Sequence, residues 1–409
     1  MLLKGYFMHQ PSNTTTTPEL SSQFVVLMAL ACGLCAGSAY FNQPLIYSIQ
    51  KSLNISTDQA GWSVILAQVG YGLGLMLLVP LGDLLNKRKL IVCLMVFAGL
   101  SQILLSFSSS LIWLYSFTLC ATFGAISAQI LIPFASSISS PAQSAATVGK
   151  LMSGLVMGII LSRTYAGFVS TFWSWQMVYF SSGIATLLFA LLMWNKLPTT
   201  KPNTQMTVAK IYRSLFQLAA SEPHLIRRAC AGALGFAILS MIFTSMTFVL
   251  ANPPYYFTDF QIGLFGLLGV IGIYSSSWSG RTVGQGKENK VAVTCICLML
   301  FSCIPLAFAQ QNILAYAIGV LMSYFGLTAF HVLNQNLVYR INPTARSRIN
   351  AVYMTIYFAG AALGSLIAVY AWQHWGWYGC VISALVFAFG ILCIDRLDFK
   401  AMKKIEIHY

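Results

Sequence analysis

The chain has 409 residues, of which 57% are hydrophobic and only 8% are charged. Soluble domains carry about a quarter charged residues, so this composition excludes an ordinary soluble protein and indicates a chain that crosses the membrane many times. The formal net charge is +14, but its basic residues are scattered over many loops, which argues against a nucleic-acid partner.

A helix needs about 20 apolar residues to cross the hydrocarbon core of a bilayer. The chain contains twelve such windows, so we expect an all-α polytopic membrane protein with twelve transmembrane helices. We predict that the segment 1–22 is a cytoplasmic tail. It is not expected to be part of a signal peptide, because the first window is too long for the apolar region of one. The windows lie near residues 23–48, 59–81, 90–108, 111–136, 147–172, 176–195, 226–250, 260–280, 290–309, 312–337, 349–371 and 376–394.

The distribution of Lys and Arg predicts the orientation, since cytoplasmic loops collect these residues. A cytoplasmic N-terminus places 21 of the 23 Lys and Arg in cytoplasmic segments. Only Lys51 then faces outside, and Arg163 lies within a window. We therefore expect a multi-pass protein of the cell (inner or plasma) membrane with both termini in the cytoplasm.

The two halves of the chain resemble each other at a constant offset of 202 residues. This offset predicts two pseudo-symmetric six-helix bundles, 23–195 and 226–395, because parallel repeats of this kind are a known transporter plan. The segment 196–225 is then a cytoplasmic linker with a helix-like run from Val208, and 396–409 is a cytoplasmic tail. The most specific matches are Gln59 with Gln261, Gly61 with Gly263, Trp173 with Trp375 and Trp175 with Trp377.

A charged turn, Gly82-Asp83-Leu84-Leu85-Asn86-Lys87-Arg88, follows the second window. It resembles the loop of the major facilitator superfamily between the second and third helices. The sequence segments 74–83 and 346–350, which begin at Gly74 and Arg346, resemble motifs of the twelve-helix drug and purine-nucleoside efflux branch. The members of this branch are drug:proton antiporters. The chain departs from that branch with Ile159 at a motif proline and Cys120 at a frequent arginine. The resemblance implies a monomeric secondary transporter and a gating role for Gly82, Asp83, Lys87 and Arg88.

Arg163 lies in the middle of the fifth window. A charge at membrane depth costs several kcal/mol and usually marks a functional site. No acidic residue lies in any window, so the partners of Arg163 would be helix carbonyls, water, or a polar or anionic ligand. Two roles follow: direct contact with substrate, or a place in the interface between the halves, which we favour.

Polar residues in the first and fourth helices of each half are candidates for a substrate cavity, as the resemblance implies. A purely structural role is the alternative, since polar groups in lipid must find partners within the protein. Gln129 and His331 are related by the 202-residue offset and should face each other. His331 is also the candidate proton carrier, because free histidine titrates near pH 6.5. The candidates are Asn42, Gln43, Gln129, Thr244, Ser245, His331, Asn334 and Gln335.

Closely spaced glycines occur in the second, fifth and eleventh windows, and small residues four apart let helices approach closely. The resemblance places these helices, with the eighth, at the contact between the halves. The glycines are Gly70, Gly72, Gly74, Gly154, Gly158, Gly360 and Gly364.

We expect a secondary active transporter of a small organic solute that works by alternating access, through proton-coupled efflux of a drug- or nucleoside-like substrate. The chain lacks the glycine-lysine motif of an ATP-binding loop. Its ten Cys lie in apolar windows and predict no metal site, cofactor or disulfide framework. The expected partners are the substrate, protons and the lipid bilayer. The alternatives are an importer or facilitator of an anionic metabolite and, more remotely, a membrane-embedded enzyme or sensor.

Overall fold

The computed structural model describes residues 20–199, 207–283, 285–342 and 346–406, and the regular structure of these residues is entirely helical. The N-terminal half contains α1 (Ser22–Ser38), α2 (Asn42–Leu53), α3 (Thr57–Leu77), η1 (Pro80–Asp83), α4 (Lys87–Ser106), α5 (Leu111–Ala125), α6 (Ser127–Ile138), α7 (Pro141–Phe172) and α8 (Trp175–Lys196). The linker contains α9 (Val208–Ser221). The C-terminal half contains α10 (Pro223–Leu250), α11 (Asp259–Leu264), η2 (Phe265–Val270), α12 (Ile271–Thr282), α13 (Glu288–Ala307), α14 (Ile313–Tyr339) and α15 (Arg346–Glu406).

The predicted membrane windows correspond to these helices. Among the described residues, ten helices are long and apolar enough to cross a membrane, and α1 with α2 forms an eleventh span bent by 48°. One of the ten, Arg348–Phe399, covers the last two windows, because α15 continues through a kink at Gly376 (φ 61°, ψ −151°). The prediction of an all-α polytopic membrane protein is therefore confirmed.

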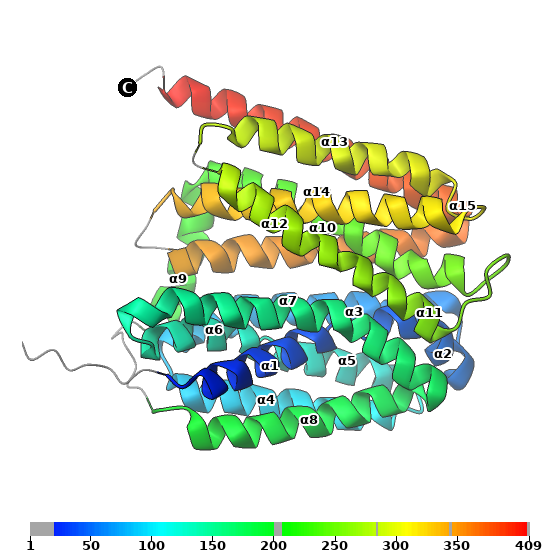
Figure 1. Cartoon of the computed structure of the whole chain (residues 1–409), viewed down its shortest axis with the longest axis horizontal. Coiled ribbons are helices and arrows are strands. Elements are labelled where there is room, and N and C mark those ends of the chain that lie inside the picture. Colours follow the sequence, from blue (N-terminus) through cyan, green and yellow to red (C-terminus); the bar gives the residue numbers. More distant parts are fainter. Residues whose placement is uncertain (1–19, 200–206, 284, 343–345, 407–409) are drawn as a thin grey trace, which may run out of the picture.

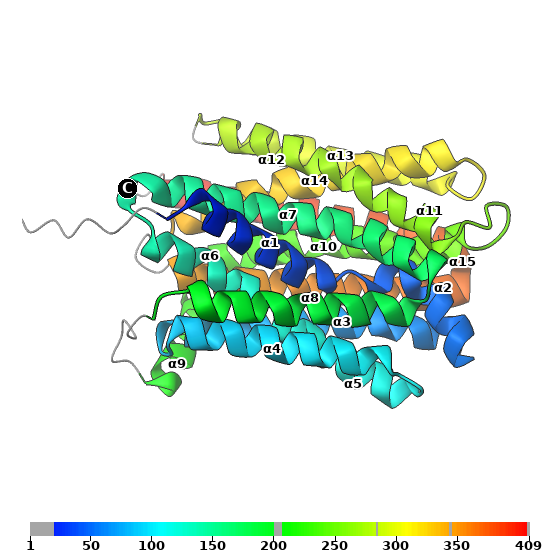
Figure 2. The same cartoon turned by 60° about the horizontal axis from the view of Figure 1, so that its bottom comes forward.

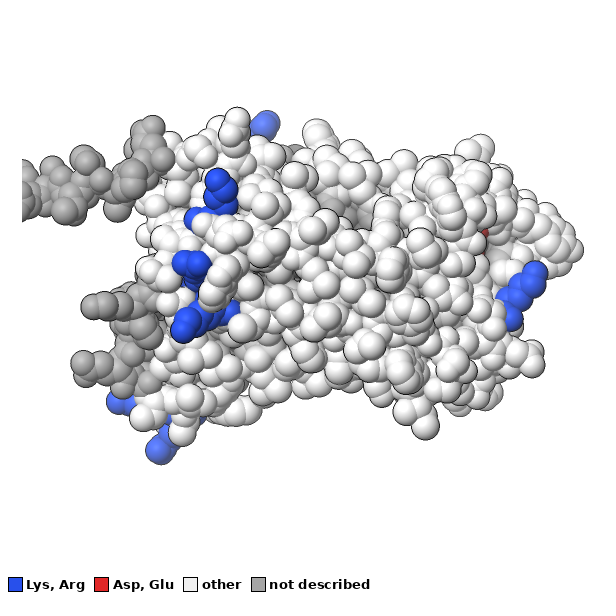
Figure 3. Space-filling view, turned by 90° about the horizontal axis from the view of Figure 1, so that it is seen from below, with Lys and Arg blue, Asp and Glu red and all other residues white. Residues whose placement is uncertain are grey.

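The two halves lie side by side with their long helices roughly parallel. In Figure 1 the N-terminal half occupies the lower part of the molecule and the C-terminal half the upper part. Lys and Arg gather at the end that contains α9, with a single small basic patch at the opposite end (Figure 3). We refer to the first as the basic end and to the opposite end, which contains α2 and α11, as the far end.

At the far end, residues matched by the 202-residue repeat form the same local structure in both halves. The Ser56 side chain caps α3, and the Gln59 side chain bonds back to the cap residue. Thr258 and Gln261 form the same reciprocal capping box at α11. Such a box satisfies two backbone N–H groups that a helix start otherwise leaves without partners. The paired glutamines of the repeat therefore mark two equivalent helix starts.

The closely spaced glycines bring helices together, but mostly within each half. A Cβ at Gly158 of α7 would lie 2.2 Å from the carbonyl oxygen of Gly33 in α1. A Cβ at Gly360 of α15 would lie 2.1 Å from the carbonyl oxygen of Ala233 in α10. The expectation that these glycines let helices approach closely is confirmed at both positions, and each contact lies within one half. They fasten the fifth span to the first and the eleventh span to the seventh.

The halves do meet through the second, fifth, eighth and eleventh spans. The rings of Tyr71 in α3 and Phe358 in α15 stack with centroids 4.6 Å apart. At the far end, a Cβ at Gly263 of α11 would lie 2.4 Å from the carbonyl oxygen of Arg163 in α7. From this contact α7 and α12 diverge toward the basic end (Figures 1 and 2). The two halves are therefore in tight contact at the far end, where α7 meets α11.

The segments outside the bundles differ from simple tails. The helix-like run predicted in the linker is α9, and the hydroxyl of Tyr212 donates to the carbonyl oxygen of Leu77 at the end of α3. The predicted tail 396–409 continues α15 as far as Glu406. Residues 1–19 of the predicted N-terminal tail lie outside the described residues.

Candidate functional site

Arg163 lies between the two halves and is 2% exposed. Its Nε donates a hydrogen bond of 2.6 Å to Oε1 of Gln43, and a terminal nitrogen donates to the carbonyl oxygen of Ile159 over 3.3 Å. Its guanidinium carbon lies 4.9 Å from the ring centroid of Tyr40 and 4.1 Å from that of Phe243. Because Phe243 belongs to α10, Arg163 reaches from one half into the other.

These contacts offset the cost of burying the charge. No carboxylate of the described residues forms an ion pair with Arg163. A hydrogen bond from a charged donor contributes about 1.5–3 kcal/mol, and a desolvated cation–π contact about 2 kcal/mol. Several such contacts are comparable with the penalty of several kcal/mol for a buried charge. Arg163 therefore has a set of neutral partners, as its isolation in the sequence suggested.

The position equivalent to Arg163 in the second half is Ser365, and it also bonds to the first span of its half. The Ser365 hydroxyl lies 2.7 Å from that of Ser240 and 2.9 Å from that of Thr244, both in α10. The Ser245 hydroxyl donates to the Met241 carbonyl of its own helix. Thr244 and Ser245 are both 0% exposed. The hydroxyls of these two candidates therefore find their partners within the C-terminal half.

Asn42 also turns away from the space between the halves. Its Oδ1 accepts a hydrogen bond from the hydroxyl of Tyr179 in α8, which lies in the same half. The neighbouring Gln43 points to Arg163, and its carbonyl oxygen accepts a bond of 2.7 Å from the hydroxyl of Thr247 in α10. Of this candidate pair, Gln43 alone joins the halves through the described hydrogen bonds.

Gln129 and His331 are connected through aromatic side chains. Nε2 of Gln129 donates to the Tyr71 hydroxyl over 3.2 Å, and the Tyr71 ring stacks on Phe358. Phe358 contacts Tyr357 edge to face, and the Tyr357 ring centroid lies 4.5 Å from that of His331. Gln129 and His331 are both half-buried. This run of rings crosses between the halves, with a hydrogen-bonding side chain at each end.

His331 has a further partner on α15, because its Nδ1 lies 3.1 Å from the Tyr353 hydroxyl. Asn334, one turn further along α14, is 0% exposed. Gln335 is half-buried, and its Nε2 lies 4.0 Å from Sδ of Met354. His331 and Gln335 are thus the partly accessible members of the candidates on α14.

The charged turn after α3 forms η1 and the start of α4. Asn86 caps α4 by accepting a bond from the Lys89 amide, and Lys87 is the first residue of the helix. The Arg88 guanidinium carbon lies 4.6 Å from the ring centroid of Trp194 in α8. Gly82 is buried in η1, whereas the side chain of Asp83 lies outside the described part of the structure. Arg88 therefore packs within the N-terminal half, and a gating role for the loop stays a prediction.

A buried carboxyl group at the far end was missed, because it lies just outside the predicted windows. Asp259 is 6% exposed and accepts hydrogen bonds from the hydroxyls of Ser48 and Ser170. It is the first residue of α11, one position before the predicted window. The capping sequence from Thr258 to Gln261 was the signal that could have placed it in the helix.

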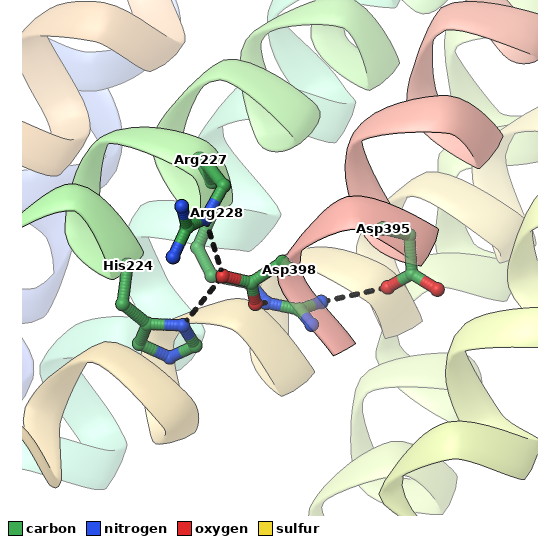
Figure 4. A network of polar contacts seen from close by, with 5 residues as sticks. All are labelled: His224, Arg227, Arg228, Asp395 and Asp398. Atoms are coloured by element: carbon green, nitrogen blue, oxygen red, sulfur yellow. Dashed lines mark hydrogen bonds and ion pairs between the residues drawn. The ribbon is translucent and has the colours of Figure 1, made fainter. Parts of the chain in front are cut away.

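A network of buried ion pairs near the basic end was also missed (Figure 4). Asp398 of α15 accepts bonds from Arg227 at 2.8 Å and Arg228 at 2.6 Å, and lies 2.8 Å from Nδ1 of His224. Arg228 also binds Asp395 over 2.8 Å. The last apolar window ended at residue 394, so the helix was expected to stop before these acids. The network fastens the start of α10 to the end of α15.

Comparison with known proteins places this geometry in a family. The model of the Major Facilitator Superfamily matches residues 28–304. The Uncharacterized transporter YgaY of Escherichia coli O157:H7 is 38% identical over 374 residues, which cover 91% of this chain and 95% of that protein. The Probable transporter SCO4007 of Streptomyces coelicolor is 26% identical over 91% of this chain and 87% of its own length.

Solved structures with this fold share little sequence with the chain. A bacterial homolog of the human lysosomal transporter Spinster, in an inward-facing and unoccupied conformation, aligns with a TM-score of 0.72 at 12% identity, covering 94% of this chain and 98% of that chain. A mutant of the nucleoside transporter NupG aligns with a TM-score of 0.71 at 11% identity, covering 91% of this chain and 99% of that chain. The relatives are transporters and not enzymes, and the chain belongs to the Major Facilitator Superfamily of membrane transporters.

Proposed function

We propose that the protein is a secondary active transporter that exports a small drug- or nucleoside-like solute in exchange for protons. The observation that carries this proposal is the run of rings between Gln129 and His331. Planar aromatic solutes stack on such rings, and the polar side chains at its two ends can bind the edge of a solute. Because the run crosses between the halves, a solute bound there would contact both of them.

In this proposal the basic end faces the cytoplasm and both termini lie there, as cytoplasmic loops collect Lys and Arg. The protein acts as a monomer in the cell membrane. Alternating access then consists of the two six-helix halves rocking about the central site. The tight contact of α7 with α11 supports a state that is closed on the outside.

His331 is the proposed proton carrier within this site. It is half-buried, and the Tyr353 hydroxyl lies beside its Nδ1. A histidine changes its charge near neutral pH when it is accessible to water. Gln129, Gln43, Arg163, Asn334 and Gln335 are the proposed substrate-binding residues, whereas Asn42 and Thr244 support the helices that carry them.

The test is transport by purified protein in liposomes with an imposed pH gradient, with nucleosides, sugars and cationic dyes as candidate solutes. We expect an aromatic solute to move against the proton gradient, and His331→Gln to remove the pH dependence while leaving downhill exchange. Thr355→Ala is a matched control, because the Thr355 hydroxyl donates to the Ala351 carbonyl of its own helix. The proposal would be contradicted if the transport rate did not depend on the pH gradient. It would also be contradicted if His331→Gln and the parent showed the same pH dependence.

A second candidate is an importer or facilitator of an anionic metabolite, and Arg163 favours it. A guanidinium offers five donors, and the described hydrogen bonds of Arg163 to Gln43 and Ile159 use two of its nitrogens. Counterflow of small carboxylates and phosphate esters in the same liposomes would select this function. Under it, the aromatic solutes would neither move nor compete.

A further inference from the structure

The Asp259 carboxyl group connects the two halves at the far end. Its Oδ2 accepts a hydrogen bond of 2.6 Å from Ser170 of α7, and the same oxygen accepts one from Ser48 of α2. Asp259 belongs to the C-terminal half, whereas both serines belong to the N-terminal half. These two bonds can therefore exist together only while the far end is closed.

Backbone contacts enclose this carboxyl group. A Cβ at Gly167 of α7 would lie 2.2 Å from the carbonyl oxygen of Asp259. The amide of Phe260 donates a bond of 3.0 Å to the hydroxyl of Thr171. Separating α7 from α11 would break these contacts and expose the carboxyl group to water at the far end.

Among the described residues, no basic side chain forms an ion pair with Asp259. The elements packed against α11 are α7, α2, α10 and η2. Their titratable and charged side chains are Arg163, bonded to Gln43, and Lys150 and Tyr165 on α7; Tyr47 and Lys51 on α2; and His224, Arg227, Arg228 and Cys230 toward the basic end of α10. Burial without a cation favours the neutral, protonated form of a carboxyl group.

We propose that Asp259 is a proton-binding site of the transporter and that proton binding from the far side closes this end. The inference rests on the proposed transport function and adds to it a proton site separate from His331. In the step, a hydronium ion transfers its proton to the carboxylate, and the resulting acid is buried between Ser48 and Ser170. Because the closed end binds the proton more tightly than the open end, acid stabilises closure. In the proposed orientation, an outside proton would thus turn the central site toward the cytoplasm.

Hydrogen–deuterium exchange of the full-length protein in lipid nanodiscs tests this directly, without any substrate. The reporters are peptides covering 165–173 and 257–266, compared at pH 5.5 and pH 8.0 after correction for intrinsic exchange rates. We expect exchange to be about tenfold slower at pH 5.5, the effect of a difference of about one unit in proton affinity between the open and closed states. Asp259→Asn, which imitates the neutral acid, should exchange slowly at both pH values.

Two further variants separate proton binding from general damage. Ser170→Ala keeps the carboxyl group but removes one bond, so exchange should be about tenfold faster while the pH response is retained. Ser52→Ala is the matched control, because Ser52 lies one turn along α2 from Ser48 and bonds to Gln176 within the N-terminal half. It should behave like the parent at both pH values.

Faster exchange at pH 5.5 than at pH 8.0, or a full pH response in Asp259→Asn, would overturn the inference. The inference would also be overturned if sodium chloride, but not choline chloride, slowed exchange at pH 8.0, because the site would then bind sodium. These outcomes are distinct from failure of the proposed function. A parent that shows the exchange response but moves no solute in liposomes would refute proton-coupled efflux and leave the proton site standing.

Discussion

Arg163 and Gln43 are joined by a hydrogen bond of 2.6 Å from Nε to Oε1, in the same half of the molecule. The guanidinium also lies over the ring of Phe243 in the opposite half. Separation of the halves at the far end would break the contact with Phe243 but not the bond to Gln43. The bond to Gln43 thus fixes the Arg163 side chain within the N-terminal half, and its contact with the C-terminal half depends on the conformation.

Arg163→Ala removes both interactions, and we expect transport to fall at least about tenfold at normal membrane abundance, as for the loss of a hydrogen bond from a charged group. Arg163→Lys keeps the charge but loses the planar donor set, so its activity should be intermediate. Initial rates in liposomes, normalised to protein, measure the effect. Arg281→Ala, an exposed arginine on α12, serves as control. Parental rates in Arg163→Ala would mean that the charge is merely tolerated.

Gly158→Ala introduces a Cβ that would lie 2.2 Å from the Gly33 carbonyl oxygen, so α1 and α7 must move apart. Overpacking of this kind costs about 1–3 kcal/mol. We expect a lower melting temperature in detergent. Gly149→Ala on the same helix is the matched control, because a Cβ there meets nothing within 4 Å. Equal melting temperatures for the two variants would refute the close contact.

Asp398→Asn leaves Arg227, Arg228 and His224 without the carboxylate that they share. Breaking a buried ion pair by removing one partner costs about 3–5 kcal/mol, so thermal unfolding should occur at a clearly lower temperature. The control is Glu288→Gln, whose partner Arg340 has a side chain that is 53% exposed. Exposed ion pairs contribute about 0–1 kcal/mol. Similar losses in both variants would argue against a stabilising role for the buried network.

Asp83→Asn should lower turnover more than it lowers substrate binding, because the loop is predicted to act on the equilibrium between conformations. The measurements are the transport rate and the equilibrium affinity for the solute identified in liposomes. Lys287→Gln, in the equivalent loop of the second half, where Gln285 occupies the position of Asp83, should change neither quantity. An unchanged rate in Asp83→Asn at normal expression would remove the loop from the mechanism.

Local sequence signals predicted the helices well and their ends less well. The apolar windows of about 20 residues marked every span, because lipid requires that each backbone group be satisfied within its own helix. The window 260–280 began one residue after Asp259, and the last window ended shortly before Asp395 and Asp398. Hydropathy cannot detect a carboxyl group that is stabilised by hydroxyls or guanidinium groups brought from another helix.

The sequence by itself determined the membrane class, the two six-helix halves and the isolation of Arg163, because these depend on composition, spacing and repetition along one chain. Only the tertiary structure decided which side chains meet. It placed Gly158 against Gly33 and Asp259 between Ser48 and Ser170. The reason is physical: a contact depends on the rotation and tilt of both helices, and these are fixed by the simultaneous packing of all their neighbours.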